Sequence, residues 1–249
     1  MSDSLAPSAP PRDGTTSAQQ RVLAILEILL CSSVPTQLAL GYLLMLGGFS
    51  PTTANGSLSL PYVLTLSLAD TLLLIVLMVT LLHAHGEDAT TLWMGHKSVR
   101  REALVGVALI PAVFLFVVVL LNALRLLFPG LHNVPTNPLE ALAGNSAEDA
   151  ALFGLLAIIA GGVREELQRA FILHRFEQHL GGGAVGVIVW NTAFGLGHYV
   201  QGWDAVITTG VLGAIWGLVF LDRRSSVAPV VSHAGFNSLE ILRVVMGVR

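Results

Sequence analysis

Charged side chains are scarce in this chain of 249 residues, in which Asp, Glu, Lys and Arg together make up 12%. Soluble domains carry about 25% of these residues, and half that share cannot cover the surface of a soluble fold of this length. The shortage excludes an ordinary soluble enzyme, a disordered chain and a nucleic-acid-binding protein. The 53% of hydrophobic residues and a mean hydropathy of +0.72 indicate a membrane protein with several spans, in contact with lipid.

Cysteine is nearly absent, since Cys31 is the one cysteine of the chain. A single thiol excludes a disulfide framework and a zinc site built from cysteines. Aromatic residues reach only 7%, and the formal net charge of −3 gives no indication of a strongly acidic or basic partner.

Long apolar runs are what the sequence has in abundance. A transmembrane helix needs about 20 apolar residues, and runs of roughly this length alternate with short polar breaks after Arg21. We therefore predict an all-α fold, a polytopic membrane helical bundle with about seven transmembrane helices. The seven predicted segments are 22–47, 59–83, 103–128, 150–174, 184–203, 205–222 and 227–246.

The chain divides into two parts by composition. Residues 1–20 are rich in Pro, Ser, Ala, Thr and Gln and contain no apolar run, which predicts a disordered N-terminal tail. Residues 21–249 are predicted to form a single transmembrane domain, because seven spans leave no room for a soluble one. Lys and Arg occur in the tail and in every second break, so the N-terminus is predicted to be cytoplasmic.

Ionisable residues inside the apolar runs are expensive to insert and are functional candidates by default. Asp70 and Arg125 are isolated, and we expect Asp70 to be a helix-packing partner and Arg125 to reach the membrane surface. Gly213 and Gly217 form a GxxxG pair, which favours close helix packing. A further group in the second break is expected to be a solvated loop: His83, His85, Glu87, Asp88 and His96.

The last four runs differ because three of them carry polar sets. The fourth contains Arg164-Glu165-Glu166-Leu-Gln-Arg169, the fifth contains Phe194-Gly-Leu-Gly-His198, and the seventh contains His233 and Asn237. Glu165 and His198 each lie roughly 22 Å along a helix from the turn at 181–183, at 1.5 Å per residue. These sets can therefore meet at one depth in the cytoplasmic half of the bilayer.

Two carboxylates, two histidines and an amide suit the hydrolysis of a peptide bond. A glutamate can be the general base that deprotonates water, and histidines can polarise the scissile carbonyl directly or through a metal. Asn237 can donate to the oxyanion. The metal alternative uses Glu165, His198 and His233 as a His₂Glu zinc site with one open position.

The order and spacing of these residues resemble the CPBP family of intramembrane proteases, which includes the CAAX prenyl endopeptidases and the bacterial Abi proteins linked to bacteriocin processing or immunity. The matching motifs are Glu165-Glu166, Phe194 to His198 and His233 to Asn237, within a catalytic core of about 150–246. The resemblance implies that Glu165 activates water with help from His198. It further implies that His233 and Asn237 stabilise the oxyanion and that Glu166 orients the site.

One residue departs from the family pattern. The family arginine falls five residues after the first glutamate, where this chain has Ala170, and Arg169 lies one position earlier. A shift of one residue turns a side chain by about 100° around a helix. We therefore expect Arg169 to pair with Glu165 rather than with Glu166.

The resulting prediction is an endopeptidase in a bacterial plasma membrane that cuts a peptide or protein near the cytoplasmic face. A lipid-modified CAAX tail and a bacteriocin precursor are candidate substrates by resemblance. Two alternatives stay open. One is a non-catalytic scaffold or immunity protein with the same fold, and the other is a proton- or metal-coupled transporter, in which membrane Glu and His residues are also expected.

Overall fold

The computed structural model describes residues 16–143 and 146–247, and the all-α prediction is confirmed within these ranges. The β pairing found among these described residues is an isolated bridge between Thr52 and Leu58. The main helices are α1 (Ala18–Leu30), α2 (Val34–Leu46), α3 (Leu60–Ala84), α4 (Ala89–Met94), α5 (Val99–Leu127), α6 (Glu140–Ala143), α7 (Ala147–Leu156), η2 (Ala157–Arg164), α8 (Glu165–His179), α9 (Gly183–Leu196), α10 (Trp203–Arg223) and α11 (Val227–Val245). Short 3₁₀ turns are η1 (Pro129–Leu131) and η3 (Tyr199–Gln201).

Every predicted apolar segment is largely helical, and the chain is an integral membrane protein. Four helical stretches of the described chain are long and apolar enough to cross a bilayer: 18–46, 60–84, 99–127 and 203–223. The segment at 147–179 carries the charged motif, and α9 is a shorter apolar helix. The count of seven spans therefore stays a prediction.

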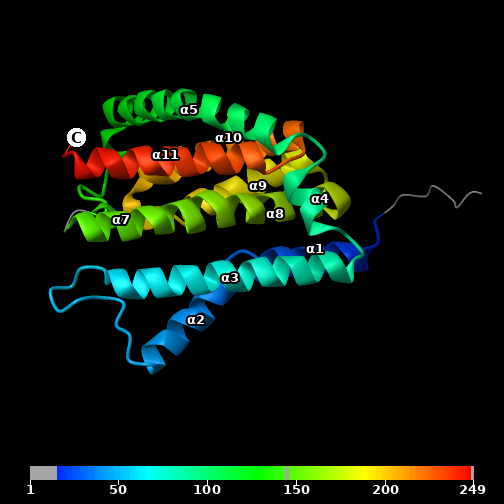
Figure 1. The fold of residues 1–249 in the computed structure, drawn as a ribbon, viewed down its shortest axis with the longest axis horizontal. Coiled ribbons are helices and arrows are strands. Elements are labelled where there is room, and N and C mark those ends of the chain that lie inside the picture. The colour runs from blue at the N-terminus through cyan, green and yellow to red at the C-terminus, as the bar shows by residue number, and fades with distance from the viewer. Residues whose placement is uncertain (1–15, 144–145, 248–249) are drawn as a thin grey trace, which may run out of the picture.

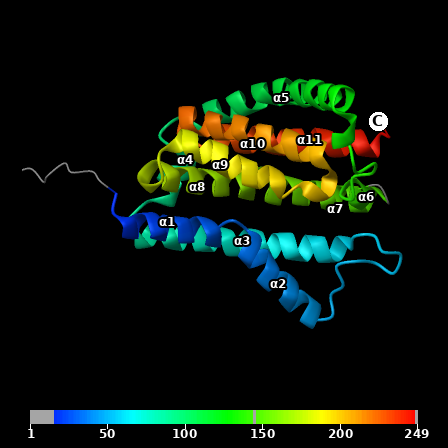
Figure 2. The same cartoon turned by 180° about the vertical axis from the view of Figure 1, so that it is seen from behind.

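Two groups of helices lie side by side in the bundle (Figure 1). Helices α5, α8, α9, α10 and α11 pack together, with α11 in contact with both α5 and η2. Helices α1 and α3 lie along the other side of α8, and α2 packs on α3 while diverging from the bundle (Figure 2). Helix α8 is thus covered on both sides.

The first apolar run is one candidate span that is divided into two helices. Helix α1 ends at Leu30 and α2 begins at Val34, with Ser33 in the left-handed region at φ 69°. Pro35 lies in the first turn of α2, where its missing N–H is tolerated but cannot continue a preceding helix. The break therefore has a local cause, although the hydropathy of the run is uninterrupted.

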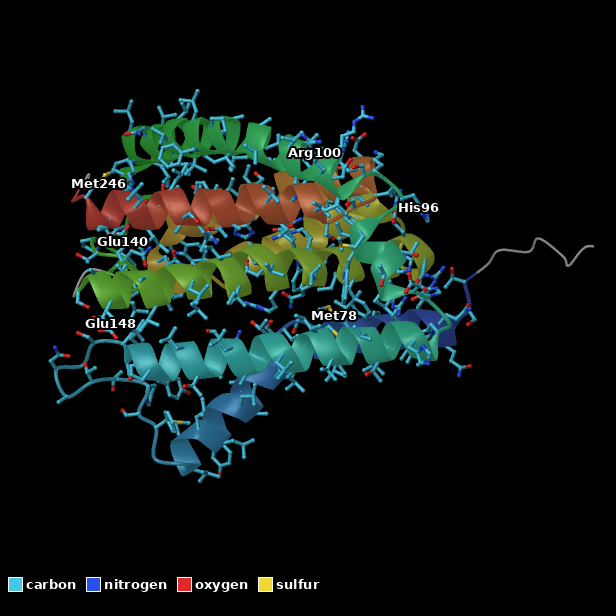
Figure 3. All side chains as sticks on the ribbon, viewed as in Figure 1. Met78, His96, Arg100, Glu140, Glu148 and Met246 are labelled. Carbon is cyan, nitrogen blue, oxygen red and sulfur yellow. The ribbon has the colours of Figure 1, made fainter. Side chains whose placement is uncertain are left out.

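The breaks that carry Lys and Arg gather at one end of the bundle, where Arg223 binds Glu102 and Arg224 binds Glu177. Figure 3 shows His96 and Arg100 at that end, and Glu140, Glu148 and Met246 at the opposite end. This grouping agrees with the alternation of Lys and Arg along the chain, while the assignment of that end to the cytoplasm stays a prediction. Most of the predicted tail, residues 1–15, lies outside the described residues; at 16–20, Ser17 caps helix α1, which begins at Ala18.

Candidate active site

The glutamate motif follows a π-helical stretch. Helix α7 runs through η2 into α8 without interruption, and the hydrogen bonds of η2 have the wider π spacing over residues 157–164. Such stretches are rare and occur often at functional sites, since they change the direction in which the following side chains point. The residues turned in this way are Arg164, Glu165 and Glu166.

Two glycines allow α11 to approach this stretch closely. A Cβ on Gly162 would lie 2.6 Å from the Cβ of Ala234, and one on Gly161 would lie 2.5 Å from Nδ2 of Asn237. Neither distance leaves space for a methyl group. The glycines therefore bring His233 and Asn237 of α11 against the glutamate motif.

Glu166, Arg169 and His233 form a buried cluster. Nδ1 of His233 lies 2.8 Å from Oε1 of Glu166, and the same carboxylate oxygen accepts a hydrogen bond from Nη1 of Arg169. Glu166 is 2% exposed and Arg169 is fully buried. Charges at this burial persist only when they are paired, so the three side chains hold one another in place.

Residues of α9 and α10 complete the walls of this cluster. Nε of Arg169 donates to Oδ1 of Asn191 at 3.1 Å, and its guanidinium lies 4.8 Å from the ring centre of Phe194. The ring of His233 stacks on Trp216 with centroids 3.8 Å apart. A Cβ on Gly213 would clash with Oδ1 of Asn191, so this glycine provides the close packing that the GxxxG pair predicts.

The expected pairing of Arg169 with Glu165 is wrong. Arg169 pairs with Glu166, three residues earlier on the same helix, a spacing that also brings side chains together. Asn191 and Phe194 of α9 hold the guanidinium on the Glu166 side. Contacts with a neighbouring helix thus decide a choice that the spacing along one helix left open.

Glu165 lies in a different environment from Glu166. Its side chain is 14% exposed, and its carboxylate accepts a hydrogen bond of 3.3 Å from Nη2 of Arg164. Within the described chain, the ring nitrogens of His198 and His233 bind Phe194 and Glu166 instead of this carboxylate. Glu165 is therefore the more accessible of the two adjacent acids.

His198 lies two residues beyond the end of α9, at the start of η3. Its Nδ1 is 2.9 Å from the carbonyl oxygen of Phe194, and a carbonyl can only accept, so Nδ1 carries the hydrogen. Its ring packs edge-on against Phe194, with centroids 4.9 Å apart. His198 is thereby connected to Arg169 through Phe194, and its Nε2 is left as the basic nitrogen.

Asn237 binds the backbone of the π-helical stretch. Its Nδ2 donates to the carbonyl oxygen of Ala157 at 3.0 Å, one helical turn along α11 from His233. This bond joins α11 to η2 next to the Glu166–His233 contact. One N–H of the amide is used in this way, and the other is the group that could donate to a substrate.

The described residues hold no group of three His, Cys, Asp or Glu side chains arranged as metal ligands. Glu165, His198 and His233 therefore do not form a ready-made zinc site. The zinc alternative stays a prediction from the sequence.

A second polar network was not found from the sequence. Glu27, hidden in the first apolar run, is 4% exposed and accepts a 2.6 Å hydrogen bond from Nε of Arg175. Arg175 also donates to Glu87 at 2.5 Å, and His85 lies 2.6 Å from Glu27. Of the group predicted to be a solvated loop, His83, His85, Asp88 and His96 are exposed. Glu87 is partly buried, and it and the exposed His85 have partners in this ion-pair network, which the sequence did not predict.

Glu87 of this network lies in the loop between α3 and α4. Burial opposes its ionisation, but hydrogen bonds from Gln178 and Arg175 outweigh that effect, and the pKa of Glu87 falls below its ordinary value. The carboxylate is therefore charged, and it joins the loop between α3 and α4 to Arg175 and Gln178 of α8.

The two isolated charges also have partners. Asp70 is fully buried on α3 and accepts hydrogen bonds from Thr36 and Gln37 of α2, which confirms it as a helix-packing partner. Arg125 was predicted to reach the membrane surface. It binds Asp204 at 2.9 Å, and its side chain is half-exposed while paired in this way.

One comparison with known proteins gives a match. Residues 147–239 match the family model described as type II CAAX prenyl endopeptidase Rce1-like. The matched segment contains η2, α8 and the residues of α9, α10 and α11 that surround Glu166. No curated protein and no solved structure matches the chain.

Proposed function

We propose, from the premise that residues 147–239 belong to the Rce1-like family of type II CAAX prenyl endopeptidases, that this membrane protease cuts its substrate with water activated by Glu165. The observation that carries the proposal is the unequal environment of two adjacent acids. Glu166 is enclosed by Arg169 and His233, while Glu165 is partly accessible and bonded to Arg164. Two carboxylates in different environments are suited to different roles.

Glu165 takes the proton of a water molecule, and the hydroxide oxygen forms a bond to the carbonyl carbon of the scissile peptide. The basic Nε2 of His198 orients this water or relays its proton. When the tetrahedral intermediate collapses, the C–N bond breaks and the amine leaves with the proton returned by Glu165. The products are one carboxylate and one amine.

His233 and Asn237 stabilise the oxyanion in this proposal. Because Nδ1 of His233 is bound to the Glu166 carboxylate, the orientation of the ring is fixed, and with a hydrogen on Nε2 the ring can donate to a developing negative charge. Glu166 and Arg169 act as positioning residues, since both are enclosed and neither can reach a substrate freely.

The substrate in this proposal is a peptide or protein with a lipid-modified CAAX-type tail, cut near the cytoplasmic face of a bacterial plasma membrane. The family supports a CAAX-type substrate. The gathering of Lys and Arg at one end of the bundle supports the orientation.

The test uses the purified full chain in lipid vesicles. The probe is a peptide that ends in a farnesylated Cys-aliphatic-aliphatic-X sequence, with a fluorophore and a quencher on either side of the bond after the cysteine. We expect wild type to cleave it and Glu165→Gln to lose about 10²–10⁴-fold in kcat, as expected on removal of a general base.

The matched control is Glu177→Gln, which changes the same residue type at the far end of α8, where Glu177 binds Arg224. This variant should cleave like wild type. Equal rates for wild type and Glu165→Gln would refute the role of Glu165. Cleavage of an unmodified peptide alone would refute the lipid-modified substrate.

A further inference from the structure

The break in the first apolar run lies against the glutamate helix. Nε2 of Gln168 donates to the carbonyl oxygen of Cys31 at 2.5 Å and to Oγ of Ser33 at 3.1 Å. Gln168 thus supplies a donor to a carbonyl freed where α1 ends. Side chains of α8 therefore stabilise an irregular backbone that the bilayer alone would not tolerate.

Arg164 occupies the centre of this contact. Its Nη1 donates to Oγ of Ser33 at 2.5 Å and lies 3.7 Å from Oδ2 of Asp70. Its Nη2 donates to Glu165 at 3.3 Å. The two ends of one guanidinium thus join the N-terminal helices to the acid that is proposed to activate water.

Asp70 is itself held firmly. Thr36 donates to its Oδ1 at 2.5 Å and Gln37 to its Oδ2 at 3.2 Å, so both carboxylate oxygens have partners from α2. Asp70 is fully buried and Arg164 is 8% exposed, where a charge without a partner would be costly. The position of Arg164 is therefore set by α2 and α3 rather than by α8 alone.

We infer that Arg164 is a positioning residue for Glu165 and that Asp70 and Ser33 hold it, so that the three N-terminal helices set the geometry of the catalytic acid. The inference deepens the proposed function and rests on it. A planar guanidinium fixes a carboxylate through directed hydrogen bonds, whereas an ammonium group supplies charge alone. The direction of the Glu165 carboxylate is thereby fixed from the side of the bundle opposite to α9–α11.

The first measurement is the kinetics of the full chain in vesicles on the farnesylated peptide. Arg164→Gln and Asp70→Asn should each lower kcat roughly ten- to hundredfold with KM unchanged, since a misplaced base affects the chemical step. Arg164→Lys should recover only part of the rate. Rates are expressed per folded enzyme, measured as the monodisperse fraction.

The matched control is Glu102→Gln. Glu102 is also a buried carboxylate, and both of its oxygens bind one arginine, Arg223 of α10. A merely structural role for Asp70 would lower the folded fraction in Asp70→Asn as in the control and leave kcat per folded enzyme unchanged. That result would overturn the inference.

The second measurement does not depend on activity. The infrared carboxylate band of Glu165 is identified by its loss in Glu165→Gln. We expect this band to shift in Arg164→Gln and in Asp70→Asn and to stay in place in Glu102→Gln. An unchanged band in the first two variants would overturn the inference even if one of them folds too poorly for kinetics.

The two proposals fail in different ways. A wild-type chain that cleaves nothing, or a fully active Glu165→Gln, would refute the proposed function and with it the catalytic role of Arg164. An active wild type with an inactive Glu165→Gln but normal kcat in Arg164→Gln and Asp70→Asn would refute the positioning role alone.

Discussion

Helix α8 presents two polar faces that look alike in composition and differ in their partners. One face, with Glu166 and Arg169, contacts α9, α10 and α11. The other, with Gln168 and Arg175, continues the side on which Arg164 lies and contacts the N-terminal helices. The Glu165-Glu166 motif is divided between them, since Glu166 contacts the first group of helices and Glu165 pairs with Arg164 on the second side. The comparison teaches that residues that bind the side chains of a short motif can lie outside it, on helices far away in the sequence.

The largest effect is expected from a substitution in the first face, the one that contacts α9, α10 and α11. Arg169→Met leaves Glu166 buried without its cation, which should lower the free energy of unfolding by roughly 3–5 kcal/mol and reduce cleavage. The loss of activity should be smaller than in Glu165→Gln, because the proposed base is not altered. Unfolding in detergent micelles and the vesicle assay measure the two effects.

Two variants accompany this prediction. Arg101→Met removes an exposed arginine at the start of α5 and should change the unfolding free energy little. The double variant Glu166→Leu with Arg169→Met should recover stability but not activity, since an apolar pair can replace a buried ion pair. If Arg169→Met is as stable as wild type, the buried pairing of Arg169 with Glu166 is contradicted.

A smaller effect is expected from a substitution that moves the first face away from α11 and leaves the contacts of the second face unchanged. In Gly162→Ala the new methyl group meets the Cβ of Ala234 at 2.6 Å and its Cα at 2.8 Å. Backbone must move to make room, so we expect a loss of about 1–3 kcal/mol in the free energy of unfolding and a lower rate as His233 moves from Glu166.

Gly154→Ala is the matched control for this substitution. The nearest atoms to a Cβ on Gly154 are those of Ile241 at 3.9 Å, an ordinary contact. This variant should be as stable as wild type or slightly more so, because alanine favours helix over glycine. Equal effects of the two substitutions would contradict the close approach of η2 and α11.

The smallest effect tests the far end of the second face and depends on pH. The folded-state pKa of Glu87 lies below its ordinary value of 4.5, so its stabilisation is present above that pH and is lost as pH falls through the folded value. Glu87→Gln should be less stable than wild type by about 1 kcal/mol near neutral pH. The gap should close in acid.

Glu148→Gln is the control, since Glu148 is exposed at the opposite end of the bundle (Figure 3). Its difference from wild type should not follow the same course with pH. Unfolding in micelles between neutral and acidic pH makes the comparison. A gap for Glu87→Gln that stays constant into acid would contradict the ionised contact with Arg175 and Gln178.

The fold class follows from the length of the apolar runs. Counting residues from the turn at 181–183 predicts one depth for His198 and Glu165, but α9 ends at Leu196, two residues before His198, so the count describes the helix only up to that point. The sequence could not predict that Arg169 pairs with Glu166 instead of Glu165, because the contact of Arg169 with Asn191 on α9 determines that pairing.

Other features could not be predicted because they depend on contacts between distant segments. A hydropathy window averages over Glu27, and its partner Arg175 lies 148 residues away. The break at Ser33 is stabilised by Arg164 and Gln168. The π-helical stretch leaves only an indirect trace in the sequence, the pair Gly161-Gly162.

The two-sided polarity of α8 has a consequence for the order in which the protein enters the membrane. Each charged residue opposes insertion by about 2.5–3.5 kcal/mol at a helix centre, and this segment carries several. During synthesis α1, α2 and α3 precede it, so Ser33 and Asp70 are already in the bilayer to receive Arg164. Glu166 and Arg169 have only each other until α9, α10 and α11 follow. The N-terminal helices therefore supply polar partners that lower the cost of inserting Arg164 before the rest of the bundle is made.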